Sequence, residues 1–145
     1  MMTTTTTQDR LDALMMWYGT LTLQSLSEIE HYYAADARFK DPFNDVCGHA
    51  AIGRVFQHMF ATTTAPRFVI DTRLVDGDQA FVTWTFMFGI KGKQYTIVGG
   101  SHLYFDDAGL VALHRDYWDA AEELLQKLPL IGVPIKWLRR LFAVK

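Results

Sequence analysis

The stretch Tyr33–Phe43 reads YAADARFKDPF, and a second acidic stretch far along the chain, His114–Asp119, reads HRDYWD. Both place carboxylates among aromatic side chains. A carboxylate is strongly hydrated, so one that is held in an apolar wall needs either a pairing partner or a chemical use. Together the two stretches predict one fold that brings them to an enclosed pocket.

The composition predicts a single domain with a large apolar core. Of the 145 residues, 50% are hydrophobic and 14% are aromatic, which is enough to fill a core and to line a cavity or an interface. The net charge of -2 gives no reason to expect nucleic-acid binding. The single cysteine, Cys47, excludes an internal disulfide. Residues 1–7 show no signal-peptide pattern, so we expect them to be a disordered tail and the protein to be cytoplasmic.

Hydrophobic periodicity predicts helices first, then strands, then helices again. Pro42 disfavours helix at Asp41, so an extended piece is expected from Phe39. Three N-terminal helices are expected, over 8–23, 28–34 and 48–61. Four strands separated by hairpin turn residues follow, over 67–75, 79–90, 94–105 and 110–118. Two further helices, separated at Pro129, are expected over 119–128 and 134–142. The predicted class is α+β, with a curved antiparallel sheet of about four long strands wrapped around the three N-terminal helices.

This order of elements, together with the YAADARFKDP run, resembles the nuclear transport factor 2-like superfamily. That superfamily includes ketosteroid isomerases, SnoaL-type polyketide cyclases and limonene epoxide hydrolases. The resemblance covers residues 8–128 and leaves 129–145 as an amphipathic C-terminal extension. It implies a cone-shaped domain with a central apolar pocket, and commonly a homodimer through the outer face of the sheet. Because one fold hosts many activities and many plain binders, the resemblance alone does not name a reaction.

Asp41 falls where ketosteroid isomerases place their general base, and a carboxylate can take a proton from beside a carbonyl group and return it elsewhere. Those enzymes also stabilise an oxyanion with a tyrosine and a protonated aspartate. The corresponding positions here are near Trp17, which offers an indole N–H, and at Ser101, which offers a hydroxyl. Tyr18 is expected to point elsewhere on its helix. The alternative for Asp41 is a turn aspartate, placed before Pro42, that caps backbone amides.

Asp116 resembles an acidic catalytic residue of the epoxide hydrolases. The arginine and second aspartate of those enzymes would fall near Val82 and Trp84, which are apolar, so epoxide hydrolysis is not expected. Strand alternation places His114, Asp116 and Trp118 on one face, which we expect to line the pocket. His114 would then orient Asp116 or balance its charge. The alternative is a satisfied polar pair that only fixes the pocket floor.

The predicted strand over 79–90 forms the apolar wall of the pocket, because Val82, Trp84 and Phe86 share one of its faces. Trp84 is either a core residue or a surface on which a flat ligand stacks. The five histidines show no paired ligand spacing, so no metal site is expected. A glycine-rich phosphate loop is also absent from the sequence, and we expect no cofactor.

Two functional hypotheses follow. In the first, the protein is a cofactor-independent isomerase or cyclase that uses Asp41 or Asp116 as general base on a small apolar or aromatic molecule. In the second, it is a non-catalytic ligand-binding or protein-interaction domain of the same fold, with structural carboxylates. A raised pKa at a pocket carboxylate would favour the first hypothesis.

The C-terminal extension has its own pattern. Lys136, Arg139 and Arg140 flank a stripe formed by Ile135, Leu138, Leu141 and Phe142. We expect this helix to pack on the domain or on its dimer partner. The alternative is a helix that lies in a membrane surface.

Overall fold

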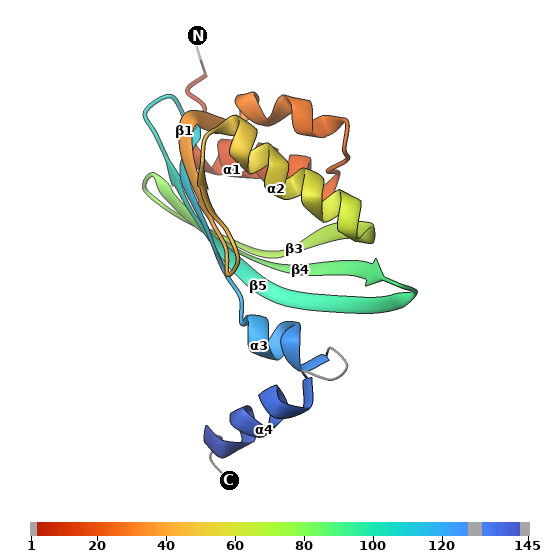
Figure 1. The fold of residues 1–145 in the computed structure, drawn as a ribbon. Helices are drawn as coiled ribbons and strands as arrows, with labels where there is room; N and C mark the ends of the chain where they lie inside the picture. Colours follow the sequence, from red (N-terminus) through yellow and green to blue (C-terminus); the bar gives the residue numbers. More distant parts are fainter. Residues whose placement is uncertain (1–2, 128–131, 143–145) are drawn as a thin grey trace.

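The computed structural model describes residues 3–127 and 132–142 and shows one curved sheet with helices on one of its faces (Figure 1). Its six strands lie in the order β2-β1-β6-β5-β4-β3. They are β1 (Tyr33–Lys40), β2 (Asp45–Cys47), β3 (Thr64–Asp76), β4 (Gln79–Ile90), β5 (Lys93–Phe105) and β6 (Val111–Tyr117). The four-strand antiparallel meander predicted from the sequence is present as β3 to β6.

The prediction of a four-stranded, purely antiparallel sheet is wrong, because β1 and β2 extend it into a mixed sheet of six strands. β1 pairs with β6 in parallel, with Phe39 opposite His114, and β2 pairs with β1 in an antiparallel hairpin. We expected helix up to residue 34 and an extended piece only from Phe39. The register of β1 shifts between Tyr33 and Arg38, and such an irregularity changes the phase of inward and outward side chains. The alternation of buried and exposed side chains that would identify a strand is therefore interrupted in β1.

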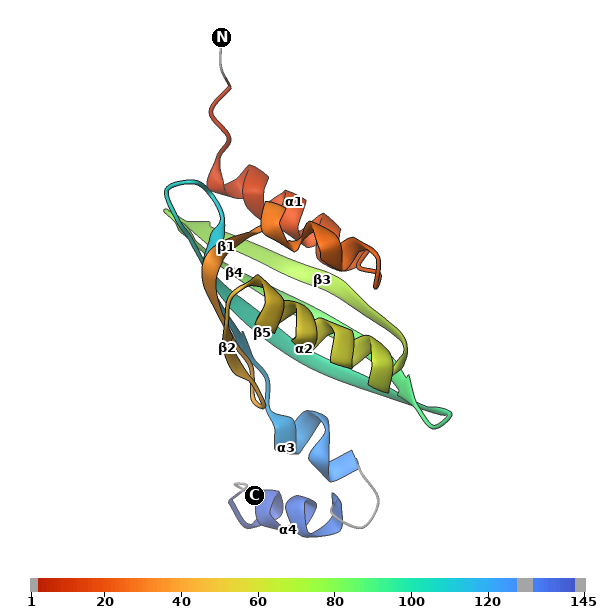
Figure 2. The ribbon, with the colours of Figure 1, turned by 45° about the horizontal axis from the view of Figure 1, so that its top comes forward.

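Three helical segments cover the sheet (Figure 2). They are α1 (Thr7–Gly19), the 3-10 helix η1 (Ser25–His31) and α2 (His49–Thr62). The expected second α-helix is thus a 3-10 helix that ends before β1. The α1 helix begins one residue earlier than expected because Thr6 and Asp9 form a capping box. The Thr6 hydroxyl accepts from the Asp9 amide at 3.1 Å, and the Asp9 carboxylate accepts from the Thr6 amide at 2.9 Å.

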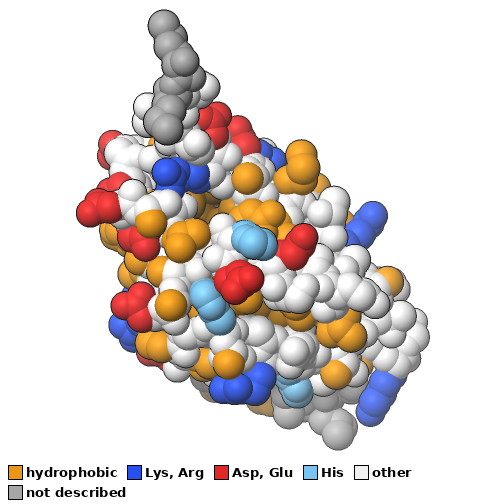
Figure 3. All heavy atoms as spheres, turned by 90° about the horizontal axis from the view of Figure 1, so that it is seen from above, with side chains coloured by type: hydrophobic (Ala, Val, Ile, Leu, Met, Phe, Trp, Pro, Cys, Tyr) orange, Lys and Arg blue, Asp and Glu red, His pale blue; other side chains and the backbone are white. Residues whose placement is uncertain are grey.

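The core lies between these helices and the inner face of the sheet. Strand alternation places Val82, Trp84 and Phe88 of β4 on this face, and all three are buried. Helix α1 packs into the same core through Leu11 and Leu14, and the ion pair between Arg73 and Asp12, 2.7 Å long, ties α1 to β3. Seen from above, basic and acidic side chains are interspersed over the helix-bearing face rather than gathered into one basic patch (Figure 3).

Beyond β6 the chain leaves the sheet. It forms α3 (Ala120–Glu123), the short 3-10 helix η2 (Leu125–Lys127) and α4 (Gly132–Phe142). The single helix expected over 119–128 is therefore two short segments, the first of which is capped by the Asp119 carboxylate. The expected break at Pro129 and the first two residues of the expected N-terminal tail lie outside the described residues. Within the described ranges, no helix is long and apolar enough to cross a membrane.

Candidate functional site

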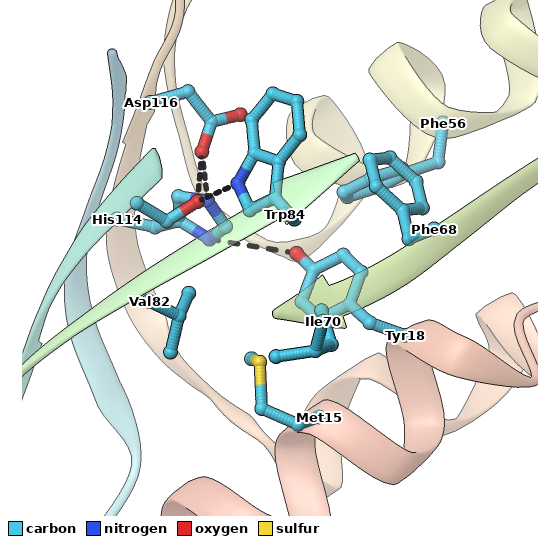
Figure 4. A pocket seen from close by; sticks show the side chains of 10 residues that line it. Met15, Tyr18, Phe56, Phe68, Ile70, Val82, Trp84, His114 and Asp116 are labelled. Carbon is cyan, nitrogen blue, oxygen red and sulfur yellow. Dashed lines mark hydrogen bonds and ion pairs between the residues drawn. The ribbon is translucent and has the colours of Figure 1, made fainter. Parts of the chain in front are cut away.

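A cavity between α1, α2 and the inner face of the sheet holds the candidate site (Figure 4). Its inner chamber contains about 330 Å³ of space that protein atoms do not fill, part of it open to solvent. An outer chamber of about 660 Å³, part of it open to solvent, adjoins the inner one and shares four lining residues with it. The shared residues are Phe56, Phe68, Trp84 and Asp116. Asp41 and Trp118 line the outer chamber, so the structure brings Asp41 and Asp116 to one cavity.

Asp116 is held on the sheet by two hydrogen bonds to one of its oxygens. Its Oδ1 accepts from the Ser101 hydroxyl at 2.5 Å and bonds His114 Nε2 at 2.6 Å. The Ser101 hydroxyl in turn accepts from the indole N–H of Trp84 at 2.8 Å. The indole N–H of Trp84 therefore already has a hydrogen-bond acceptor, and its ring lines the cavity. Ser101 links this indole to the Asp116 carboxylate.

The hydrogen-bond chain continues from His114 into the helix layer. His114 Nδ1 lies 2.6 Å from the Tyr33 hydroxyl, which also hydrogen-bonds the Tyr18 hydroxyl. All of these groups are satisfied when Tyr18 donates to Tyr33, Tyr33 donates to Nδ1 and Nε2–H donates to Asp116, which is how we assign the tautomer. The geometry thus gives His114 the orienting position that the sequence predicts, with Asp116 as its acceptor.

The second oxygen of Asp116 has a different environment. The side chain is 15% exposed, and its Oδ2 makes no hydrogen bond to any residue within 3–127 or 132–142. Across the same residues, every fully buried side-chain nitrogen or oxygen has a hydrogen-bond partner. It follows that Oδ2 is accessible, and Asp116 lines the inner chamber, the outer chamber and a surface depression beside Lys40 and Arg115.

Tyr18 and Tyr33, the two tyrosines of this hydrogen-bond network, are held neutral by their surroundings. Burial raises the pKa of Tyr18 well above its ordinary value, and the neighbouring Tyr33 and the Asp116 charge act in the same direction. Burial also raises the pKa of Tyr33; its bond to Tyr18 opposes this shift, and the charge of Asp116 adds to it. The two phenols are therefore hydrogen-bond donors throughout the neutral pH range.

Asp41 sits in a turn at the mouth of the outer chamber. Its Oδ1 accepts from the backbone amides of Phe43, at 2.8 Å, and Asn44, at 2.7 Å, and the Asn44 side-chain amide reaches both carboxylate oxygens at 3.1 Å. The turn places Phe43 edge-on against Trp118, with 5.6 Å between the ring centroids. This geometry favours the alternative reading of Asp41, that of a turn aspartate, although its side chain also borders the cavity.

The remaining predicted pocket residues separate into two groups. Val82, Ser101 and His114 line the inner chamber, Phe86 and Trp118 line the outer one, and Trp84 lines both. Trp17 lines neither chamber: its indole donates to the Ser25 carbonyl at 3.0 Å and stacks on Tyr32. Among the described residues, no three His, Cys, Asp or Glu side chains lie close enough to hold a metal ion.

The sequence interpretation missed Tyr18 and Tyr33. Tyr18 was expected to point away, and it instead faces the inner chamber from α1 (Figure 4). The signal was available, because Leu11, Leu14, Met15 and Tyr18 have the spacing of one helix face. Tyr33 is the first residue of the YAADARFKDPF stretch and is fully buried. A buried tyrosine needs a hydrogen-bond partner for its hydroxyl group.

The Trp84 indole packs against Gly99, so a side chain at position 99 should displace this ring. A Cβ at position 99 would lie 2.7 Å from the Trp84 ring and 3.0 Å from the Trp118 Cβ. We expect Gly99→Ala to lower the free energy of unfolding by about 2 kcal/mol, since a packed ring must move. Gly53→Ala in α2 is the matched control, because nothing lies within 4 Å of its added Cβ, and it should be neutral or stabilising by about 1 kcal/mol. Urea denaturation of both variants measures this, and equal stabilities would contradict it.

Comparison with known proteins defines the family. The profile of the SnoaL-like domain matches residues 16–114, and the chain belongs to that family, within the nuclear transport factor 2-like superfamily. The expectation drawn from the sequence is thereby confirmed. A search of curated proteins finds no match.

Solved structures share the fold at low sequence identity. A hypothetical protein of ketosteroid isomerase-like fold from Catenulispora acidiphila, in complex with trimethylamine, is 17% identical with a TM-score of 0.70, covering 91% of this chain and 98% of its own. A predicted SnoaL-like polyketide cyclase from Jannaschia is 12% identical with a TM-score of 0.70, covering 84% and 92%. TerC, co-crystallised with polyporic acid, is 16% identical with a TM-score of 0.68, covering 78% and 93%. At these identities the similarity concerns the fold alone.

Proposed function

We propose that this protein binds a small apolar or aromatic molecule in the inner chamber and acts on it by general acid–base chemistry without a cofactor, with Asp116 as the proton acceptor. The observation that carries the proposal is the open Oδ2 of Asp116, in a chamber whose other lining is largely apolar. A carboxylate in such a place can take a proton from a bound carbon acid. Membership of a family of cyclases and isomerases is in keeping with this chemistry.

The residues around Asp116 suit a proton abstraction beside a carbonyl group. Oδ2 would remove the proton from the carbon, and the electrons of the broken C–H bond would move to the carbonyl oxygen to form an enolate. Tyr18, neutral and facing the chamber, would donate its hydroxyl proton in a hydrogen bond to that oxygen in place of Tyr33. Asp116 would return the proton to another carbon in an isomerisation. In a cyclisation the enolate would attack a second carbonyl carbon, and the oxygen of that carbonyl would take the proton from Asp116 to form a hydroxyl group.

A second candidate function is ligand binding without catalysis. It is favoured by the internal bonds of Asp116, because Ser101 on β5 and His114 on β6 both use Oδ1 and the carboxylate thereby links two strands. Under this alternative a ligand fills the chamber and Oδ2 only accepts a hydrogen bond from it. TerC, a protein of this fold, was co-crystallised with polyporic acid.

Hydrogen–deuterium exchange separates the two functions. We expect the wild-type protein in D₂O to exchange the protons beside the carbonyl of 2-tetralone, an aromatic ketone, faster than buffer does, as followed by NMR. Asp116→Asn should bind the ketone, seen as shifts of pocket resonances, and should not accelerate the exchange. Asp41→Asn is the matched control and should exchange at the wild-type rate. Binding without exchange in the wild-type protein would reject the catalytic proposal in favour of the second function.

The homodimer expected from the sequence stays a proposal. Phe81 on β4, Val98 on β5 and Tyr117 on β6 project from the outer face of the sheet and are 37%, 54% and 47% exposed. Apolar side chains gathered in this way on a sheet face commonly mark an interface. The outer face is therefore the surface through which we propose a second copy binds.

A further inference from the structure

Helix α4 presents an apolar stripe to solvent. Val133, Trp137 and Leu141 follow one another at intervals of four residues and so share one side of the helix. Their exposed fractions are 72%, 60% and 61%. Of the stripe expected from the sequence, only the Leu141 side chain is described; those of Ile135, Leu138 and Phe142 lie outside the described part.

Basic side chains border this stripe. Basic and acidic residues are also distributed unevenly along the sequence. Lys136 and Arg140 each precede a stripe residue by one position, and both are exposed. Four of the fourteen basic residues lie within 128–145, whereas all sixteen acidic residues precede position 128. The first 127 residues thus carry ten basic and sixteen acidic side chains. The body of the protein is acidic, and the extension is basic.

The position of α4 leaves its stripe uncovered by the domain. The helix lies beyond α3, away from the sheet and from α1 and α2, and packs against η2 (Figures 1 and 2). None of its residues lines the inner or the outer chamber of the cavity. The packing on the domain or its dimer partner that the sequence led us to expect concerned a stripe of which only Leu141 is described; the stripe of Val133, Trp137 and Leu141 is exposed to solvent.

We propose that α4 docks in the plane of an anionic membrane surface. Val133, Trp137 and Leu141 enter the boundary between headgroups and acyl chains, where a tryptophan is well suited, and Lys136 and Arg140 meet the lipid phosphates. Eleven helical residues extend only about 16 Å, so the helix lies on the bilayer and does not span it. The same surface repels the acidic body, so the protein binds with α4 toward the lipid.

Cosedimentation of the full chain with vesicles tests this. Binding is expected to vesicles of phosphatidylcholine with about one third phosphatidylglycerol, and not to phosphatidylcholine alone. It should weaken at least about tenfold when salt rises from about 0.01 M to about 1 M. The double variant Lys136→Gln/Arg140→Gln should lose about tenfold or more in affinity, and Trp137→Ser/Leu141→Ser should abolish binding.

Matched variants on the body show whether the effect belongs to α4. Met16→Ser removes an apolar side chain that is 71% exposed on α1, and Arg54→Gln removes an exposed cation from α2. Both should bind anionic vesicles as the wild type does. Absence of wild-type binding overturns the proposal, as does binding that is equal on neutral vesicles. A lipid-free oligomer that Trp137→Ser/Leu141→Ser dissociates, with no vesicle binding, also overturns it and assigns the stripe to a second copy.

Discussion

Asp116→Ala should lower the free energy of unfolding by about 3 kcal/mol, whereas Asp116→Asn should lower it by about 1 kcal/mol. Alanine leaves His114 Nε2 and the Ser101 hydroxyl without their acceptor, and both residues are more than nine-tenths buried. Asparagine keeps a carbonyl oxygen at the Oδ1 position and directs its amide toward the cavity. Chemical denaturation of the two variants and the wild type measures the difference.

Asp45→Ala is the control for loss of a carboxylate on the surface. Its ion pair with Arg38 is 2.6 Å long, but both side chains are about half exposed, so the change should have little effect on the free energy of unfolding. If Asn and Ala at position 116 destabilise equally, the network requires the charge of the carboxylate rather than its acceptor geometry. A large loss of stability in Asp116→Asn with an unchanged rate of proton exchange in the bound ketone would assign Asp116 a structural role.

Alkaline pH should destabilise the protein by about 3 kcal/mol for each pH unit above about pH 10. A tyrosine in the unfolded chain loses its proton near pH 10, whereas the raised pKa values of Tyr18 and Tyr33 keep both protons on in the folded state. Above that pH the unfolded state binds fewer protons, so stability falls as pH rises. Each tyrosine contributes about 1.4 kcal/mol per pH unit, and below about pH 9 the two have no effect.

Single variants divide this pH dependence between the tyrosines. Tyr33→Phe should reduce the alkaline slope by about half, even though it also removes a hydrogen bond to His114. Urea unfolding at a series of pH values gives the slopes. A wild-type slope that does not change in Tyr33→Phe would mean that Tyr33 ionises in the folded protein.

The family and the residues on the inner face of the sheet could be predicted from the sequence more fully than the residues of the candidate site. Strand alternation along β4 and β6 correctly places Val82, Trp84, His114 and Asp116 toward the cavity, because β4 pairs with β5 without a register shift and β6 pairs regularly with β5 from Leu113 to Tyr117. The same reasoning fails at β1, where the irregular register breaks the alternation. Strands β1 and β6 pair in parallel and lie far apart in the sequence, so no turn motif between them indicates that they pair.

Helix α1 shows why Trp17 lies outside both chambers and why its neighbour Tyr18 was missed. Trp17 and Tyr18 are both buried, because one side of the helix meets Tyr32 and Ser25 while the other meets the cavity. When a helix is buried on two sides, its apolar residues do not fall on one face. The sequence pattern therefore does not tell which of two adjacent residues faces the pocket. Only the tertiary partner decides, and here the Ser25 carbonyl satisfies the indole of Trp17.

The parallel pairing of β1 with β6 also sets the order in which the protein can assemble during synthesis. Tyr33 and His114 hydrogen-bond across 81 residues, so their contact waits until nearly the whole domain has left the ribosome. Contacts of such long sequence separation form slowly. Until β6 arrives, β1 and β5 are unpaired edges, which are templates for association with other chains. The strand that carries the candidate carboxylate is thus also the one that closes the nascent sheet, and the newly made chain is most exposed to aggregation just before its site exists.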